Sequence, residues 1–246
     1  MKVAVIIPAA GLGTRMGRSE GAAGRKQFVS LDGAPILLHT VRKFANAPKV
    51  SEILIALREE DRESVERELR RANLAKPVRL VEGGRNRQES VANGLAQIDD
   101  DTDLVAVHDA VRPFVTLAQI DEIIAQAAEH GAVILGIPPV DTVKQVNRTQ
   151  IQSTLLRERI VLAQTPQVFR LALLRRAFEQ AQRDGFVGTD EASLVEHLGE
   201  PVHVMLGSDR NIKITKPSDL ALARLFYEEE TGRAPEPPSE AAAEGG

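Results

Sequence analysis

A glycine-containing segment near the amino terminus is the first feature of the sequence that could do chemistry. The apolar run Val3–Ile7 leads into Pro-Ala-Ala-Gly-Leu-Gly-Thr-Arg-Met-Gly at residues 8–17. Backbone N–H groups in such a turn can bind an anion, and the positively charged Arg15, Arg25 and Lys26 follow it. The segment therefore predicts a phosphate-binding turn, although a tight strand-to-helix turn with solvated cations has the same composition.

The two common glycine motifs for phosphate binding do not fit this segment. A P-loop counted from Gly11 needs its second glycine and its lysine where the chain has Met16 and Gly17. A dinucleotide-binding fingerprint that starts at Gly11 and Gly13 needs its third glycine at Met16 as well. The sequence thus disfavours a P-loop enzyme and a dehydrogenase.

Six further segments of the chain are rich in polar and charged residues. They are Glu82–Val91, Val107–Pro113, Pro139–Lys144, Gln164–Gln167, Thr189–Ser193 and Asn211–Thr215. Asp109 follows the apolar run Leu104–His108, so we expect it at the carboxyl edge of a strand, where open α/β sheets bind ligands. A carboxylate there suits a ribose or Mg²⁺, and could equally cap the following turn. His108 is expected to be structural.

In order and spacing, these segments, with residues 8–16 and Lys26–Phe28, resemble the nucleotidyltransferases that activate sugar and polyol phosphates. Within that group they resemble the 2-C-methyl-D-erythritol 4-phosphate cytidylyltransferase family of the non-mevalonate isoprenoid pathway. The resemblance covers nearly all of residues 1–227. It implies transfer of the cytidylyl group of CTP to 2-C-methyl-D-erythritol 4-phosphate, giving 4-diphosphocytidyl-2-C-methyl-D-erythritol and pyrophosphate.

Two alternatives remain open at this point. A related group of enzymes uses ribitol 5-phosphate as the acceptor, and Ala110 together with the surroundings of Arg157 favours methylerythritol phosphate over it. A non-catalytic nucleotide-binding protein is the alternative of another class, and the cations Arg15, Lys26 and Lys213 disfavour it.

The resemblance implies three groups of site residues. The transition-state stabilisers that grip the triphosphate would be Arg15 and Lys26. The CTP contacts would be Ala9, Ala10, Gly11, Gly13, Gly83, Gly84, Ser90 and Asp109. The acceptor contacts would be Arg112, Thr142, Arg157, Thr165 and Lys213. Mg²⁺ would neutralise phosphate oxygens, with Asp109 as its candidate ligand.

Two details bear on the chemistry of this site. The linker between Met16 and Lys26 looks longer than in the family, and Arg25 replaces a frequent proline, so Arg25 could share the role of Lys26. A phosphate monoester has its second pKa near 6, so the acceptor is mostly a dianion at neutral pH and needs no catalytic base. Cations are therefore expected to carry the catalysis.

The elements that must position these residues alternate along the chain. Strands are expected at Val3–Ile7, Ile53–Leu57, Val78–Val81, Leu104–His108, Ala132–Ile137 and Val202–Leu206. Helices are expected at Ile36–Ala45, Asp61–Ala72, Gln88–Ala96, Leu117–His130, Leu171–Arg183, Asp190–Leu198 and Ser218–Glu229. This alternation predicts a doubly wound, mainly parallel α/β sheet, the Rossmann-like nucleotidyltransferase fold.

Residues 140–160 do not follow this alternation. They are polar and carry a possible Asn147-Arg148 turn, which predicts a β-hairpin projecting from the sheet. Exposed strand edges tend to find a partner, so we expect this arm to form a homodimer and to complete each site in trans.

Composition sets the remaining limits. The 246 residues are 43% hydrophobic, contain no Cys and only 3% aromatic residues, and carry a net charge of −4. Residues 228–246, with six acids and one base, read as a disordered acidic tail, while residues 1–227 form one catalytic domain with a net charge of +1. Neither a nucleic acid nor a membrane is an expected partner, and without a leader or a membrane span the protein is expected in the cytoplasm.

Overall fold

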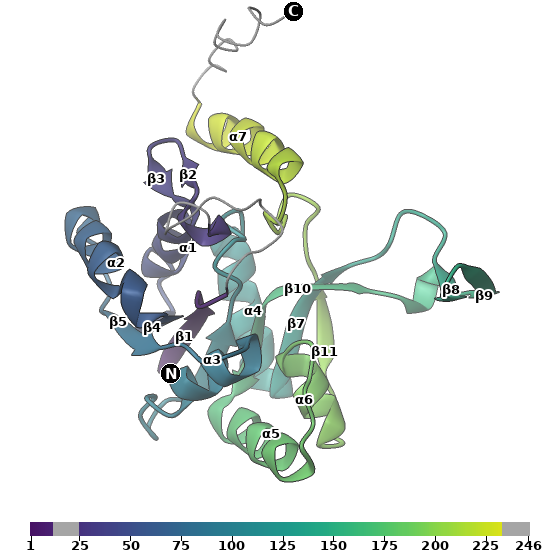
Figure 1. Ribbon diagram of the computed structural model, residues 1–246. Coiled ribbons are helices and arrows are strands. Elements are labelled where there is room, and N and C mark those ends of the chain that lie inside the picture. Colours follow the sequence, from purple (N-terminus) through teal and green to yellow (C-terminus); the bar gives the residue numbers. More distant parts are fainter. Residues whose placement is uncertain (12–24, 233–246) are drawn as a thin grey trace, which may run out of the picture.

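The computed structural model of the chain describes residues 1–11 and 25–232, and its centre is a seven-stranded sheet (Figure 1). The strand order is β11-β7-β10-β6-β1-β4-β5. The strands are β1 (Val3–Pro8), β4 (Glu52–Leu57), β5 (Val78–Glu82), β6 (Leu104–Val107), β7 (Ala132–Ile137), β10 (Leu162–Arg170) and β11 (His203–Leu206). Neighbouring strands are parallel except at β10, which runs antiparallel to both β6 and β7. The expected doubly wound, mainly parallel α/β fold is confirmed.

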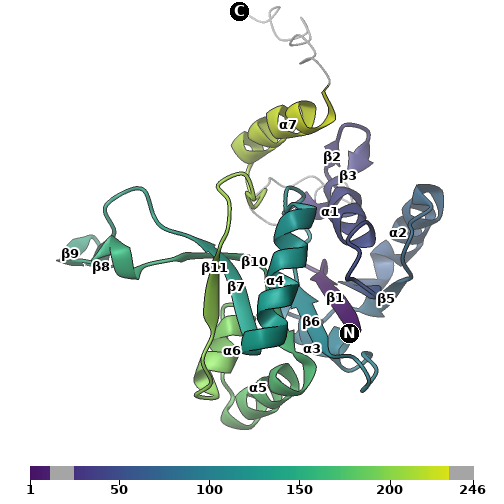
Figure 2. The same ribbon diagram turned by 180° about the vertical axis from the view of Figure 1, so that it is seen from behind.

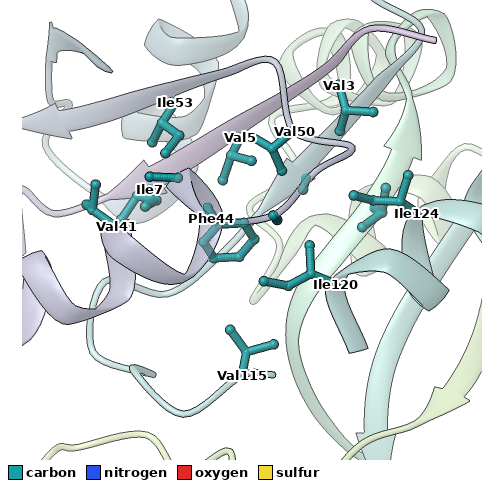
Figure 3. Close-up of a cluster of buried hydrophobic side chains, with 14 of the residues drawn as sticks. Val3, Val5, Ile7, Val41, Phe44, Val50, Ile53, Val115, Ile120 and Ile124 are labelled. Carbon is teal, nitrogen blue, oxygen red and sulfur yellow. The ribbon is translucent and has the colours of Figure 1, made fainter. Parts of the chain in front are cut away.

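Helices cover both faces of this sheet (Figures 1 and 2). They are α1 (Ile36–Ala45), α2 (Glu59–Ala72), α3 (Arg87–Leu95), α4 (Leu117–His130), α5 (Leu171–Asp184), α6 (Glu191–His197) and α7 (Pro217–Thr231). Side chains alternate along a strand, so Val3, Val5 and Ile7 of β1 face α1, α2 and α4, whereas Ala4 and Ile6 face α3, α5 and α6. In Figure 3 the first set packs around Phe44 of α1 and Ile120 of α4. Burial on both faces explains why these strands are continuous apolar runs.

Strand β10 is the main element that the sequence does not predict. Its centre is Gln164-Thr165-Pro166-Gln167, which contains no apolar run, and the Thr165–Pro166 peptide bond is cis. The buried polar side chains have hydrogen-bond partners from other segments of the chain. Gln164 Nε2 donates to Ser208 O at 2.8 Å, and Gln167 Nε2 donates to Asp190 Oδ2 at 2.7 Å. The register against β7 shifts between Gln164 and Gln167. Hydrogen bonds, and not an apolar pattern, thus specify this strand.

The predicted arm is a two-stranded hairpin of β8 (Lys144–Asn147) and β9 (Gln150–Thr154). It extends from the ends of β7 and β10 and stands clear of the rest of the molecule in both views (Figures 1 and 2). The turn lies where the sequence predicts it, with Arg148 at a φ of 52°. Val146 and Ile151 are 57% and 60% exposed on it.

Smaller features complete the fold. Lys26–Phe28 and Arg157–Arg159 are short 3₁₀ helices, and β2 (Ser30–Leu31) pairs with β3 (Ala34–Pro35) in an unpredicted hairpin. Helix α7 ends at Thr231, so residues 228–231 are helical and the predicted tail boundary at 228 is too early; residues 233–246 lie outside the described part. None of the helices in the described ranges is long and apolar enough to span a membrane.

Candidate active site

A pocket of about 260 Å³ lies at the carboxyl ends of β1, β5 and β6. It gathers residues from five separate segments of the chain. Its lining is Pro8, Ala9, Ala10, Gly11, Lys26, Gln27, Gly84, Arg85, Asn86, Arg87, Ser90, Asp109, Ala110, Val111 and Lys213. Every residue that the sequence predicts for CTP or for catalysis and that the structure describes is in this lining, except Gly83; Gly13 and Arg15 lie outside the described residues.

The wall formed by residues 9–11 is held by its backbone. Ala9 N donates to Ala56 O at 2.6 Å, continuing the pairing of β1 with β4. The buried Gln27 donates through Nε2 to Ala9 O at 2.7 Å and to Gly11 O at 3.1 Å. Gln27 therefore joins the glycine segment to the 3₁₀ helix that carries Lys26.

The opposite wall needs glycine because two backbones approach closely. A Cβ placed on Gly83 would lie 2.2 Å from Ala10 Cβ, and one on Gly84 would lie 2.2 Å from Glu89 Cβ. Gly84 N donates to Ser90 Oγ at 3.0 Å, and this hydroxyl donates to Asn86 O at 2.8 Å. Asn86 caps the amino terminus of α3, with Oδ1 accepting from Glu89 N at 2.8 Å. Gly83 thus shapes the wall from behind the lining.

Arg25 and Lys26 have separate surroundings. Arg25 is 9% exposed and faces α2, with Nη2 at 2.6 Å from Asp61 Oδ1 and Nη1 at 2.5 Å from Glu60 Oε1. Burial raises the pKa of Asp61, and the charge on Arg25 opposes that rise. Lys26 lines the pocket. Lys26 therefore lies at the pocket, whereas Arg25 forms ion pairs with α2.

Asp109 is the centre of charge in the pocket. Its Oδ1 lies 3.4 Å from Arg87 Nε, and its Oδ2 lies 3.2 Å from Arg112 Nε and 2.9 Å from Lys213 Nζ. Burial disfavours the charged form of Asp109, but the three cations outweigh burial and lower its pKa well below the ordinary value. The carboxylate is therefore ionised and fixes the positions of three positive groups.

Asp109 alone does not make a resident magnesium site. Both carboxylate oxygens already face cations, which disfavours a further positive charge. In the ranges 1–11 and 25–232, no group of three or more acidic, histidine or cysteine side chains could hold a metal ion. The protein side supplies one carboxylate, which fits only an ion that is held mainly by other ligands.

His108 is structural, as the sequence predicts. Burial lowers its pKa to about 4, so the ring is neutral at pH 7. Its Nε2 lies 3.0 Å from Arg112 O, which can only accept, so Nε2 carries the proton and Nδ1 accepts from the Thr165 hydroxyl at 3.1 Å. Thr165 Oγ1 in turn accepts from Asp109 N at 3.0 Å. Thr165 thus supports Asp109 from below the pocket.

The five predicted acceptor residues fall into two groups. Lys213, Arg112 and Thr165 contact Asp109, and the segment carrying Lys213 is fixed because Ile214 N donates to Val111 O at 3.0 Å. The other two, Thr142 and Arg157, lie at the arm, where Arg157 Nη1 donates to Val140 O at 3.1 Å. Neither residue is in the lining of the pocket of its own chain.

Three residues near the pocket were not singled out by sequence reasoning. Gln27 holds the glycine segment, and Arg87 places a guanidinium beside Asp109. The buried Glu191 forms an ion pair with Arg87. All three belong to segments quoted above, but isolated polar residues give no sign of which neighbour they will face.

Comparison with known proteins gives one consistent result. A sequence profile described as IspD, 2-C-methyl-D-erythritol 4-phosphate cytidylyltransferase, matches residues 3–229. A protein of that name from Solibacter usitatus is 56% identical over 241 residues, which cover 95% of this chain and 99% of the relative. One from Bacillus pumilus is 42% identical over 230 residues, covering 93% of this chain and 98% of the relative.

Solved structures agree in fold. The 4-diphosphocytidyl-2C-methyl-D-erythritol synthase from Anaerococcus prevotii superposes with a TM-score of 0.81 at 28% identity, covering 92% of this chain and 98% of the other. The 2-C-methyl-D-erythritol 4-phosphate cytidylyltransferase from Francisella tularensis superposes with a TM-score of 0.74 at 35% identity, covering 92% of this chain and 99% of the other.

Proposed function

Because the chain belongs to the 2-C-methyl-D-erythritol 4-phosphate cytidylyltransferase family, we propose that its pocket transfers the cytidylyl group of CTP to 2-C-methyl-D-erythritol 4-phosphate. The products are 4-diphosphocytidyl-2-C-methyl-D-erythritol and pyrophosphate. The main support for this proposal is that one pocket brings together the glycine-containing walls, Lys26 and the Asp109–Lys213 ion pair.

The reaction needs charge neutralisation more than proton transfer. An oxygen of the acceptor phosphate attacks the α-phosphorus of CTP, the bond to the β-phosphate oxygen breaks, and pyrophosphate leaves with that electron pair. The nucleophile is already a dianion at neutral pH. His108, the histidine nearest to Asp109 in the sequence, is buried, neutral and hydrogen-bonded through both ring nitrogens, which agrees with a mechanism without a base.

The nucleotide would occupy the glycine side of the pocket. Backbone groups of residues 9–11 and of Gly84 line the pocket and would contact the cytosine, since no side chain intervenes at the glycines. Lys26 would grip the triphosphate, with Arg15 expected beside it from the sequence. Preorganised cations at this position stabilise the negative charge that builds on the transferred phosphorus.

The acceptor would occupy the Asp109 side. Lys213 is held by Asp109 Oδ2 and also lines the pocket, so its ammonium is fixed where an incoming phosphate would enter. Arg112 is held by the same oxygen and by its Nη1 donation to Asn211 O at 2.7 Å. Asp109 thus acts as an anchor for cations that bind the acceptor phosphate.

Mg²⁺ enters this proposal as a component of the CTP substrate. The ion would be held mainly by phosphate oxygens and would neutralise them, with Asp109 contributing one ligand oxygen. The cytoplasmic location expected from the sequence stays a prediction.

We also propose that the protein is a homodimer joined through the arm. Val146 and Ile151 are apolar and exposed on the hairpin, and Arg157 follows the hairpin and is not in the pocket lining of its own chain. A second copy that packs on the arm would cover these apolar groups and receive Thr142 and Arg157 next to its acceptor site.

The test is pyrophosphate release from CTP in the presence of Mg²⁺. Release with 2-C-methyl-D-erythritol 4-phosphate, and much slower release with ribitol 5-phosphate, is the expected result. Equal or faster release with ribitol 5-phosphate would assign the other acceptor, and CTP binding without any release would identify a non-catalytic nucleotide-binding protein.

A further inference from the structure

Glu191 is a buried carboxylate that does not line the pocket but contacts Arg87, which does. It is the first residue of α6, is 1% exposed, and places Oε1 2.7 Å from Arg87 Nη1. Arg87 is the first residue of α3 and lines the pocket. Its Nε lies 3.4 Å from Asp109 Oδ1, so the guanidinium lies between two buried carboxylates with the shorter contact to Glu191.

The start of α6 is fixed to the strand that supports the acceptor side. Asp190 caps the helix, with Oδ1 accepting from Ser193 N at 3.0 Å. Its Oδ2 accepts from Gln167 of β10, and Gln167 Oε1 accepts from Ala192 N at 3.0 Å. Gln167 is two residues from Thr165, which holds Asp109. Glu191 and Asp109 are therefore mounted on connected parts of one framework.

Glu191 is costly to bury, which argues for a role beyond packing. Burial raises its pKa, and the charge on Arg87 opposes that rise. Among the described residues its Oε2 is buried and has no hydrogen-bond partner. A buried carboxylate with one oxygen unsatisfied is rare and needs a reason. The surroundings give an electrostatic reason: Glu191 and Asp109 both contact the Arg87 guanidinium and compete for it.

We propose that Glu191 is a positioning residue that holds the Arg87 guanidinium back from Asp109, so that Arg87 adds an anion-binding group for the acceptor phosphate beside Lys213. Arg87 already contacts Asp109 Oδ1 at 3.4 Å, and without the charge of Glu191 its guanidinium would shift further towards that oxygen. The guanidinium would then leave the position in which it can face a phosphate. This inference rests on the proposed reaction, and neither Glu191 nor Arg87 belongs to the residues assigned to it above.

The test compares Glu191→Gln with the matched control Glu196→Gln, an exposed residue of the same helix. Glu191→Gln keeps the size of the side chain and removes its charge. We expect kcat/KM for the polyol phosphate to fall roughly 10- to 100-fold, the KM for CTP to stay within about twofold, and Glu191→Asp to fall between wild type and Glu191→Gln. Glu196→Gln should behave as wild type.

A double substitution separates this role from a structural one. If Glu191 acts through Arg87, Glu191→Gln causes no further loss of kcat/KM in an Arg87→Met background. A full additional loss in that background, or a loss of kcat/KM that disappears when rates are corrected for the folded fraction, would overturn the proposal. If Glu191→Gln does not fold, the comparison of Glu191→Asp with wild type decides.

A binding measurement separates failure of this inference from failure of the proposed function. Inorganic phosphate is titrated into wild type and into Glu191→Gln by calorimetry, which requires no turnover. Weaker phosphate binding by the variant supports the role of Glu191 even if wild type releases no pyrophosphate. Equal phosphate affinity in both proteins rules the role out.

Discussion

Arg25 and Lys26 are adjacent in the chain, yet they contact different parts of the molecule. Arg25 binds Asp61 and Glu60 of α2, whereas Lys26 lines the pocket. The sequence predicts a shared role as one possibility, because neighbouring cations cannot be told apart without their partners. The direction of each side chain follows from the short 3₁₀ helix at Lys26–Phe28, which no periodic pattern indicates.

This separation gives opposite expectations for the two residues. Lys26→Ala should lower kcat on the order of 10²- to 10³-fold with a modest change in CTP affinity, because a preorganised cation acts mainly on the transition state. Arg25→Ala should instead lower the free energy of unfolding by on the order of 2–3 kcal/mol, since Asp61 loses its buried partner. Steady-state kinetics and urea denaturation of both variants measure this. Full kcat in Lys26→Ala would remove that residue from the site.

His108 should make the stability of the protein depend on pH in a defined direction. Its pKa is about 4 in the folded state, against about 6.5 for an ordinary histidine. As pH falls below 6.5 the unfolded chain binds a proton that the folded protein does not, so stability is lost between pH 6.5 and 4 and is fully present above pH 6.5. The total is on the order of 3 kcal/mol.

Urea denaturation between pH 7 and pH 5 measures this loss. The slope of stability against pH should be smaller in His108→Gln than in wild type. Burial also lowers the pKa of His39, which adds in the same direction, so some slope remains in the variant. An identical slope in both proteins would show that His108 is not buried as a neutral ring.

At the scale of elements, the sequence predicts those whose residues follow a simple period. All seven expected helices are present, and so are the six expected strands. The one strand of the central sheet that the sequence does not predict is β10. The buried residues at its centre are polar, and their partners Asp190, Ala192 and Ser208 are distant in sequence. Periodicity reports burial of apolar groups, so it cannot report a strand specified by side-chain hydrogen bonds.

In the site, too, some residues could be predicted from the sequence and others could not. Asp109 and the glycine walls could be predicted, because a polar residue directly after an apolar strand lies at the ligand-binding edge of the sheet. The contributions of Arg87 and Gln27 could not be predicted, since both act through contacts that are distant in sequence. Arg87 contacts Asp109 and Glu191, and Gln27 contacts the carbonyls of residues 9 and 11.

The amino-terminal cap of helix α3 should contribute to both stability and CTP binding. Its cap, Asn86, accepts from Glu89 N and lies beside both Gly84 and Ser90 in the pocket. Asn86→Ala should lower the free energy of unfolding by about 1 kcal/mol and raise the KM for CTP, because the first turn of α3 loses its anchor. Asn86→Ser keeps a capping oxygen and should restore most of the stability. Equal stability of the two variants would argue against the cap.

The position of Arg157 on the arm, outside the pocket lining of its own chain, allows the proposed dimer to be tested. If the arm of one copy completes the pocket of the other, a dimer of one Lys26→Ala chain and one Arg157→Ala chain contains one intact site. Random mixing of the two inactive proteins should then recover about a quarter of the wild-type activity, because half of the dimers are mixed and each of these has one good site. Native mass spectrometry confirms that mixed dimers form. Mixed dimers without activity would place each site within a single chain.

The base of the arm has a consequence for how the family can diversify. Ile137 pairs with Leu162 across β7 and β10, so the two ends of the arm leave the sheet as neighbours. An insertion whose two ends are paired residues of neighbouring strands can change length or composition without shifting any residue of the core. If the dimer proposed above forms through the arm, arms exchanged between two family members should therefore give chimaeras that fold like their parents and assemble with the protein that donated the arm. In that case, changes confined to the arm can keep related enzymes in one cell from assembling with each other.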